Sequence, residues 1–427
     1  MRIEILCTGD EVLTGKITNT NYSYMAQKLE DMGLSVVWGT TVGDDRATLL
    51  AAFRAAAARA DAVIVNGGLG PTVDDLSQEI AAEAAGVGLA FHAGWFATME
   101  AFFAARSRAM PANNRKQAML PEGAELLDNP VGTACGFALT IGKARFFFTP
   151  GVPRELRRML DDQILPRLLA MAGTPGVIHL KRFHSYGLGE SHVDQLLEGI
   201  EAMAPDGSVK LGFRAHYPQL ETKLLVRAPD AAGIAARLAP VEAEVRRRLG
   251  NFILAEDDAT LEGTVLAALT RAGATLALVE SFTGGQIAAR IAPLPGAETV
   301  LRRAVVVRDP AELAPAIGAD AARLRGSHED AAGLALIAHV ADAARNAARA
   351  SHALAILVDP DPGPDGIGFG GSILIGIATE AGTACRAARI LGGREWLRLG
   401  AVEMGLDCLR RHLAELPIDE RIDFEKR

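Results

Sequence analysis

The stretch that decides the fold of the first part of the chain is Asn66-Gly67-Gly68-Leu69-Gly70-Pro71-Thr72-Val73-Asp74-Asp75. It follows an apolar run at residues 61–65 that predicts a buried strand, and it precedes a helical pattern at residues 75–85. Glycines allow a sharp turn and let backbone N–H groups approach an anion closely. Because ligands of open α/β sheets bind at the carboxyl ends of the strands, the stretch predicts a phosphate-binding turn for a nucleotide-like ligand.

Two aspartates end this stretch, and the pattern places Asp74 and Asp75 in the first turn of the following helix. There they can cap free N–H groups, hold a divalent cation or orient a water molecule. A plain glycine-rich loop with aspartate caps accounts for the same residues. The turn alone does not decide between these two interpretations.

Strand and helix patterns alternate around the turn, which predicts a mostly parallel sheet with helices on both faces. We expect this domain to end near residue 170, because residues 166–175 have the proline, glycine and threonine content of a linker. The predicted strands are residues 2–8, 34–42, 61–65 and 146–149, and the predicted helices are residues 21–32, 49–60, 75–85 and 154–160.

The rest of the chain divides into two further regions. Residues 171–255 predict a small α+β module, and residues 256–427 predict a further α/β domain. Pro240 stands where we expect a helix to begin, a position that tolerates proline. The predicted strands are residues 177–184, 208–214, 220–227, 275–279, 353–358 and 372–379, and the predicted helices are residues 241–249, 261–272, 284–292 and 397–413.

Composition narrows the class of protein. The chain has 427 residues, 22% of them charged, and a formal net charge of −8, which argues against a nucleic-acid or membrane-surface partner. Its four cysteines form no CxxC pair, so a disulfide framework or zinc site is not expected and a reducing cytoplasm fits. No stretch of about 20 apolar residues suggests a membrane span.

Further polar loops carry groups suited to a phosphorylated ligand. Asp10 and Glu11 follow the first predicted strand and place carboxylates where a phosphate-bound metal would lie. Arg115 and Lys116 can neutralise a pyrophosphate. In isolation, helix or turn capping explains the first pair and a solvated basic patch explains the second.

Taken together, the sequences of these loops form a pattern that is specific to one protein family. The segments GDEVLTGKITNTN, TTVGDD, GGLGPTVDDL, NNRKQAMLPEGAELLDNPVGTACGF and PGVPREL, in this order, resemble the CinA family (competence/damage-inducible protein A). Residues 182–191, RFHSYGLGES, resemble the next motif of that family. The resemblance implies a molybdopterin-binding-like fold for residues 1–170. It also implies hydrolysis of the pyrophosphate of ADP-ribose or a related nucleotide, helped by a divalent metal such as Mg²⁺ or Co²⁺, with no organic cofactor.

The resemblance also implies roles for individual residues. It further implies that the protein is a homodimer and that its ligand is a small-molecule nucleotide. The sequence does not show which carboxylate orients water. The expected catalytic residues are Asp75, Asp74, Glu11 and Arg115, the expected metal ligands are Asp10, Asp44 and Asp75, and the expected ligand-binding residues are Gly67, Gly68, Gly70, Thr72, Asn114, Lys116, Asn129 and Glu190.

Residues 258–420 resemble the C-terminal domain of the family, which deamidates nicotinamide mononucleotide. The segment Glu280-Ser281-Phe282-Thr283-Gly284-Gly285 is similar to its nucleophile motif, which implies Ser281 as nucleophile at a helix N-terminus and Thr283 and Gly284 as ligand-binding residues. A Ser/Thr-Gly-Gly helix cap is the alternative. Val307 and Glu312 stand where the family has Tyr and Lys, and residues 357–364 lack the Thr and most glycines of a further motif.

Loss of the base in a serine-nucleophile unit costs about 10⁴-fold or more, so we expect little or no deamidase activity. Arg308 can supply a cation in a rewired site but not a base at neutral pH. The leading hypothesis is a nucleotide pyrophosphohydrolase. The alternatives are an active nicotinamide-nucleotide amidohydrolase in pyridine nucleotide recycling, and a molybdopterin- or nucleotide-binding protein without turnover.

Overall fold

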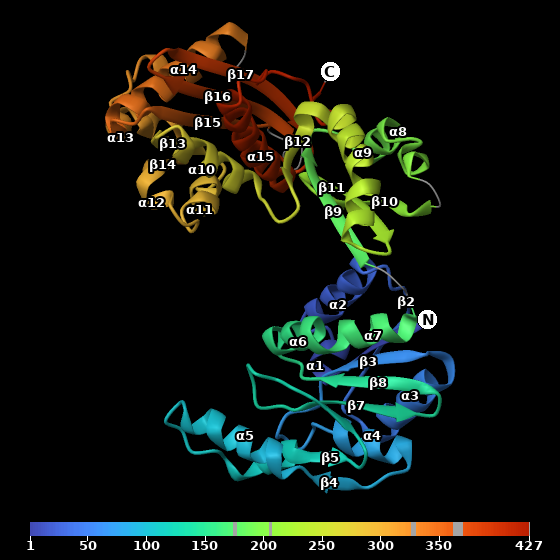
Figure 1. Cartoon of the computed structure of the whole chain (residues 1–427). Helices are drawn as coiled ribbons and strands as arrows, with labels where there is room; N and C mark the ends of the chain where they lie inside the picture. The colour runs from blue at the N-terminus through green and yellow to red at the C-terminus, as the bar shows by residue number, and fades with distance from the viewer. Residues whose placement is uncertain (174–176, 205–206, 326–329, 362–369, 427) are drawn as a thin grey trace. The chain divides into compact units, whose positions relative to one another are not determined.

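The computed structural model describes residues 1–173, 177–204, 207–325, 330–361 and 370–426. The chain forms two compact units, Met1–Ile178 and His179–Arg427. Both units are mixed α/β structures, as the sequence predicts (Figure 1).

The first unit is built on a six-stranded sheet with the order β2-β1-β3-β8-β7-β6. Strands β2, β1, β3 and β8 run parallel, and β7 and β6 are antiparallel additions, so the predicted mostly parallel sheet is confirmed. Every residue of β1 and β3 is buried, which is typical of central strands covered on both faces. The chain leaves β1 for β2 on one side and later returns to β3 on the other. This reversal creates a topological switch point between β1 and β3.

Two hydrophobic cores cover the two faces of this sheet. One joins the sheet to α2, α6 and α7 through residues such as Met25, Leu156 and Leu168. The other joins it to α3, α4 and α5 through residues such as Phe53 and Ile80. Figure 1 shows α2, α6 and α7 on one side of the sheet and α4 on the other. Helices on both faces were predicted from the alternating pattern.

Side-chain caps fix the starts of two helices of the first unit. Asn19 accepts a hydrogen bond from the backbone N–H of Tyr22, and Asp45 accepts one from that of Thr48. The elements are β1 (Ile3–Thr8), α1 (Asp10–Leu13), α2 (Thr20–Asp31), β2 (Val36–Val42), α3 (Arg46–Arg59), β3 (Ala62–Asn66), α4 (Ser77–Ala85), β4 (Leu89–Phe91), α5 (Ala93–Ala104), η1 (Ala112–Ala118), β5 (Met119–Pro121), β6 (Glu125–Leu127), β7 (Gly136–Ile141), β8 (Ala144–Thr149), α6 (Pro153–Met159), η2 (Leu160–Ile164) and α7 (Leu165–Ala172).

The predicted linker at residues 166–175 is wrong over most of its length. Helix α7 continues to Ala172, and its buried Leu165 and Leu168 belong to a core of the first unit. Pro166 lies near the start of α7, directly after the π-helical turn η2 with which α7 is continuous. The rest of the predicted linker, residues 174–176, lies outside the described residues.

The second unit contains a four-stranded sheet, β10-β11-β9-β12, and a five-stranded sheet, β14-β13-β15-β16-β17. In the larger sheet β14, β13 and β15 are parallel, while β16 and β17 are antiparallel. The elements are β9 (Val177–Tyr186), α8 (Glu190–Leu196), η3 (Ile200–Met203), β10 (Val209–His216), β11 (Gln219–Ala228), α9 (Ala231–Leu249), η5 (Gly250–Phe252), β12 (Ile253–Glu256), α10 (Leu261–Arg271), β13 (Leu276–Ser281), α11 (Gln286–Ile291), α12 (Ala297–Val300), β14 (Leu301–Val307), η6 (Pro310–Glu312), α13 (Leu313–Ile317), η7 (Arg323–Arg325), α14 (Asp330–Ala348), β15 (His352–Pro360), β16 (Gly370–Thr379), β17 (Gly382–Leu391) and α15 (Arg394–Leu413).

Pro240 does not begin a helix, contrary to the prediction. It lies inside α9, which starts at Ala231 after the cap Asp230. The buried residues Ile234 and Leu238 continue the apolar face of α9 on the N-terminal side of the proline, so packing on the small sheet outweighs the lost backbone hydrogen bond. No helix in the described part of the chain has both the length and the apolar character needed to cross a bilayer.

Candidate functional site

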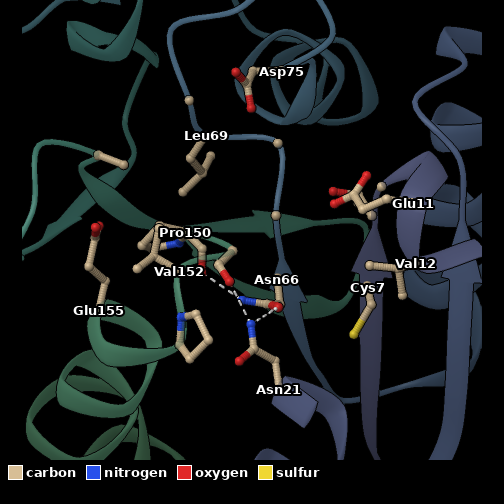
Figure 2. Close-up of a pocket in the computed structure, with 18 of the residues that line it drawn as sticks. Cys7, Glu11, Val12, Asn21, Asn66, Leu69, Asp75, Pro150, Val152 and Glu155 are labelled. Carbon is tan, nitrogen blue, oxygen red and sulfur yellow. Dashed lines mark hydrogen bonds between the residues drawn. The ribbon is translucent and has the colours of Figure 1, made fainter. Parts of the chain in front are cut away.

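A cavity of about 560 Å³ lies at the switch point of the first sheet. The carboxyl ends of β1, β3 and β8 reach it with Thr8, Asn66 and the turn that begins at Pro150. Figure 2 shows side chains from these separate segments around one pocket. The site therefore lies where open α/β sheets bind their ligands.

The glycine turn forms one wall of this pocket, and its geometry requires glycine at two positions. Gly67 and Gly68 have φ of 115° and 70°. A Cβ on Gly67 would lie 2.5 Å from Thr8 Oγ1, and one on Gly68 would lie 2.4 Å from Ser77 Oγ. The backbone N–H groups of Gly68, Leu69 and Gly70 donate no hydrogen bond within the described residues, whereas the N–H of Gly67 donates to Thr149 O. Three unpaired donors thus remain for an anion.

The aspartates of the turn do not lie in the first turn of α4, as the sequence suggested, because that helix begins at Ser77. Asp75 instead closes the loop: its Oδ2 accepts hydrogen bonds from Thr72 N at 2.8 Å and Thr72 Oγ1 at 2.5 Å. The first N–H of α4, from Ser77, donates to Gly68 O. Both aspartates still line the pocket, but they act on the loop rather than as helix caps.

All charged side chains among the described residues of the lining are carboxylates. None of the described residues that line the pocket is a lysine, arginine or histidine. Burial, together with the nearby Asp10, Glu11 and Asp74, raises the pKa of Asp44. The carboxylates that line the pocket are Glu11, Asp44, Asp74, Asp75 and Glu155. A phosphate could bind here only if a cation offset this negative charge.

The basic residues predicted to neutralise a pyrophosphate lie outside the lining. Lys116 donates to Thr72 O at 2.9 Å, and its charge helps to lower the pKa of Asp74. The Arg115 guanidinium lies over the ring of Phe91, 4.0 Å from its centroid. Cation–π contact competes effectively with solvent for an exposed arginine, and sequence spacing gives no indication of it.

The predicted residues Asn114 and Asp10 do not line the pocket themselves but bind residues that do. Buried Asn114 donates to Gln117 Oε1 at 2.8 Å, and Gln117 in turn donates to Leu69 O at 3.0 Å. Asp10 and Asp44 exchange backbone-to-carboxylate hydrogen bonds of 3.1 and 3.2 Å. Glu190 begins α8 in the second unit.

The predicted metal site was tested against this donor set. No group of three or more His, Cys, Asp or Glu side chains in the described residues is arranged to hold a metal ion by itself. Mg²⁺, however, is commonly bound by one or two carboxylates together with substrate phosphates. Asp44, with Glu11 and Asp74 beside it, fits an ion shared with a ligand, because these carboxylates have no cationic partner in the pocket lining.

Two parts of the site were missed by the motif analysis. Asn21 donates to Asn66 Oδ1 at 3.0 Å and to Gly151 O at 2.7 Å, while Asn66 donates to Pro150 O at 2.7 Å. These bonds, drawn in Figure 2, tie the loop after β8 to the glycine turn. Glu155 also lines the pocket, where burial raises its pKa. In the sequence, the position of Glu155 in the segment PGVPREL was the only feature that could have indicated a role in the site.

The C-terminal motif lies at the end of β13. Ser281 is buried and is still part of that strand, and α11 begins only at Gln286, so the expected position at a helix N-terminus is wrong. Fully buried Glu280 accepts hydrogen bonds from Thr283 Oγ1 and from the N–H groups of Ile287 and Ala288. These donors serve Glu280 and are not available to a substrate.

The parallel pairing of β13 and β14 places Val307 beside Ser281. Within the described residues, Ser281 Oγ makes no hydrogen bond to any base. Gly284, the other predicted ligand-binding residue here, has a φ of 70° in the turn before α11. Of the weakened motif at residues 357–364, residues 362–364 lie outside the described residues.

Comparison with known proteins finds matches along most of the chain. Residues 4–170 match a family model described as a probable molybdopterin binding domain. Residues 180–255 match the damage-inducible protein CinA KH domain, and residues 258–413 match the CinA C-terminal domain.

Curated relatives span nearly the whole chain. A CinA-like protein of Shewanella sediminis is 36% identical over 97% of this chain and 96% of its own length. A protein of Shewanella oneidensis named nicotinamide-nucleotide amidohydrolase PncC is 34% identical with the same coverage. Among solved structures, a CinA protein of unknown function from Thermoplasma acidophilum is 30% identical and covers 40% of this chain and 96% of its own, with a TM-score of 0.35.

Proposed function

Since this chain belongs to the CinA family, we propose that it is a hydrolase whose N-terminal pocket binds a nucleotide through its phosphates and cleaves the pyrophosphate of ADP-ribose or a related nucleotide. The observation that carries this proposal is the pairing of an anion-binding glycine turn with a lining that holds carboxylates and no cationic side chain. A site of this kind suits a phosphate ligand that arrives with a metal ion.

The protein's own groups have distinct tasks in this proposal. The N–H groups of Gly68, Leu69 and Gly70 donate to phosphate oxygens and hold the pyrophosphate against the turn. Asp44, together with one of its neighbours Glu11 and Asp74, would hold a divalent ion that the phosphates also bind. That ion, when bound, would neutralise charge on the phosphates and polarise them. Asp75 keeps the turn in shape through Thr72.

The proposal is tested by incubating the purified full-length protein with ADP-ribose, with and without Mg²⁺ or Co²⁺. Hydrolysis consumes one water and yields AMP and ribose 5-phosphate in equal amounts. Tight binding of ADP-ribose without either product would favour the alternative of a binding protein without turnover.

A second candidate function is supported by the name of a relative. The Shewanella oneidensis protein is named a nicotinamide-nucleotide amidohydrolase, and residues 258–413 match the C-terminal domain of the family. These comparisons support amidohydrolase activity more directly than pyrophosphate hydrolysis. The local chemistry opposes it here, because Val307 lies beside Ser281 and no base contacts that serine within the described residues.

Ammonia release from nicotinamide mononucleotide tests this second function, with Ser281→Ala as its matched control. Without an activated nucleophile, the wild-type rate should equal that of Ser281→Ala. Ammonia release that Ser281→Ala abolishes would establish the amidohydrolase and refute the inferred loss.

A further inference from the structure

The N-terminal pocket has a second end that phosphate binding does not use. Figure 2 shows Glu155 on the far side of the pocket from Glu11, on α6 rather than on the loops after β1 and β3. Figure 2 shows Leu69, Pro150 and Val152 on the same side of the pocket as Glu155, and the lining also includes the apolar residues Ala134 and Pro153. Flat apolar side chains of this kind suit the face of an aromatic ring.

Glu155 is held in place by the loop in front of it. Buried Asn129 donates through Nδ2 to Glu155 Oε2 at 2.7 Å and to Ala134 O at 2.9 Å. A Cβ on Gly132 would lie 2.1 Å from the Glu155 carboxyl group, so a larger residue there would displace this side chain from its present position. Residues 129–134 therefore pack closely around this carboxylate. Asn129, which was predicted to bind the ligand, instead holds Glu155 in place.

The nearby Arg154 attracts this carboxylate and acts to lower its pKa, but less strongly than burial raises it. Glu155 forms no ion pair within the described residues, and its Oε1 accepts no hydrogen bond there. Burial in this apolar wall raises its pKa, the expected response of a carboxylate with too few donors. Glu155 is half-buried, and an acceptor oxygen that lines a pocket without a donor of its own is suited to a donor on the ligand.

We propose that Glu155 recognises the nucleotide by accepting a hydrogen bond from an amino group on the edge of its base, with adenine as the base. The inference rests on the proposed function only in taking a nucleotide as the ligand. Adenine carries an exocyclic amino donor at position 6, whereas hypoxanthine carries a carbonyl oxygen there. The carbonyl oxygen of hypoxanthine would face the carboxylate with no hydrogen bond between them, and the two oxygens would repel each other.

The experiment measures equilibrium binding of AMP and IMP to the full-length protein in Mg²⁺ by calorimetry. The two probes share one phosphate and one ribose and differ at position 6 of the base. Wild type should bind AMP on the order of tenfold more tightly than IMP. In Glu155→Gln, whose amide nitrogen can donate to a carbonyl, the ratio should fall below about threefold or reverse.

Asp128→Asn is the matched control, because Asp128 is exposed, adjoins Asn129 and does not line the pocket. This variant should keep the wild-type ratio. Equal binding of AMP and IMP by wild type, no binding of either, or an unchanged ratio in Glu155→Gln would overturn the role of Glu155.

The outcomes also separate this inference from the proposed hydrolysis. Discrimination between AMP and IMP without any AMP release from ADP-ribose would support base recognition and reject turnover. AMP release together with equal binding of the two probes would support turnover and reject base recognition.

Discussion

Asp75 turns its carboxylate back onto Thr72, where it accepts both the backbone N–H and the hydroxyl. A Cβ on Gly70 would lie 2.4 Å from Asp75 Oδ2, so the loop is wound tightly around this carboxylate. We expect Asp75→Asn to weaken the turn that presents the unpaired N–H groups for which we propose phosphate binding. The KM for ADP-ribose should rise about fivefold to tenfold while kcat changes less than about threefold.

Steady-state kinetics on ADP-ribose checks this, with Asp128→Asn as the control. A fall in kcat at unchanged KM would contradict the positioning role and place Asp75 in the chemical step.

Asp44 should make the stability of the folded protein depend on pH. Its pKa is raised by burial and by Asp10, Glu11 and Asp74, so the folded protein binds the proton more tightly than the unfolded chain does. The stabilisation from this proton is present below the ordinary carboxylate pKa and is lost as pH rises through the raised value. At pH 7 the metal-free protein therefore carries an unfavourable ionised Asp44.

Asp44→Asn should consequently raise the melting temperature of the metal-free protein at pH 7 and leave it unchanged at pH 3. The same variant should lose any stabilisation by added Mg²⁺. Calorimetric melting at the two pH values gives the measurement. Asp45→Asn is the comparison of opposite sign, because Thr48 lowers the pKa of Asp45 and its ionised form stabilises the fold at pH 7. A lower melting temperature for Asp44→Asn at pH 7 would show that the carboxylate stabilises the fold.

At the residue scale, the sequence predicted which loops carry polar groups but not where long side chains point. Gly67, Gly68, Gly70, Thr72 and both aspartates were predicted together and meet in one pocket. Arg115 and Lys116 were predicted beside them and instead contact Phe91 and Thr72 O. Their directions depend on tertiary neighbours that a motif does not contain.

At the scale of elements, Asn66 at the carboxyl end of β3 couples that strand to the end of β8 and to α2. The Asn66 side chain, only 5% exposed, donates to Thr149 Oγ1 and Pro150 O and accepts from Asn21. Removing a buried hydrogen-bonding side chain leaves its partners unpaired and costs about 1–3 kcal/mol.

Asn66→Ala should therefore lower the melting transition of the first unit by several degrees, since each 1 kcal/mol shifts the transition of a unit of this size by about 2–4 °C. Differential scanning calorimetry measures this. Asn113→Ala, at an exposed asparagine of the same unit, should stay within about 0.5 kcal/mol of wild type. An equal effect of the two substitutions would contradict the coupling.

Two of the wrong predictions at this scale concern where a helix begins or ends. Helix α4 was expected to begin at Asp75 but begins at Ser77, because the Asp75 side chain accepts a hydrogen bond from Thr72 in the preceding loop. Helix α7 was mistaken for a linker, because Pro166 in a first helical turn is compatible with either structure. Composition predicts the existence of elements well, whereas their ends depend on side-chain hydrogen bonds and packing.

At the scale of the whole molecule, the alternation of strands and helices was sufficient to predict a mostly parallel first sheet, which is confirmed. The strand order β2-β1-β3-β8 could not be predicted from the pattern, yet it is what places the pocket at a switch point. Glu155 joins the site only through this order, since β8 brings the loop before α6 beside β3. The second unit keeps the Ser281 motif in a setting that lacks a base within the described residues.

The measurement that tests the central claim most directly is AMP release from ADP-ribose by the full-length protein. The account predicts equal amounts of AMP and ribose 5-phosphate only with Mg²⁺ or Co²⁺, at a rate that Ser281→Ala leaves unchanged. Gly68→Ala, which forces a Cβ to within 2.4 Å of Ser77 Oγ, should lower that rate at least tenfold, by roughly the 1.4 kcal/mol or more expected of a strained turn. No AMP in the presence of metal, or AMP release that Ser281→Ala abolishes and Gly68→Ala spares, would contradict it.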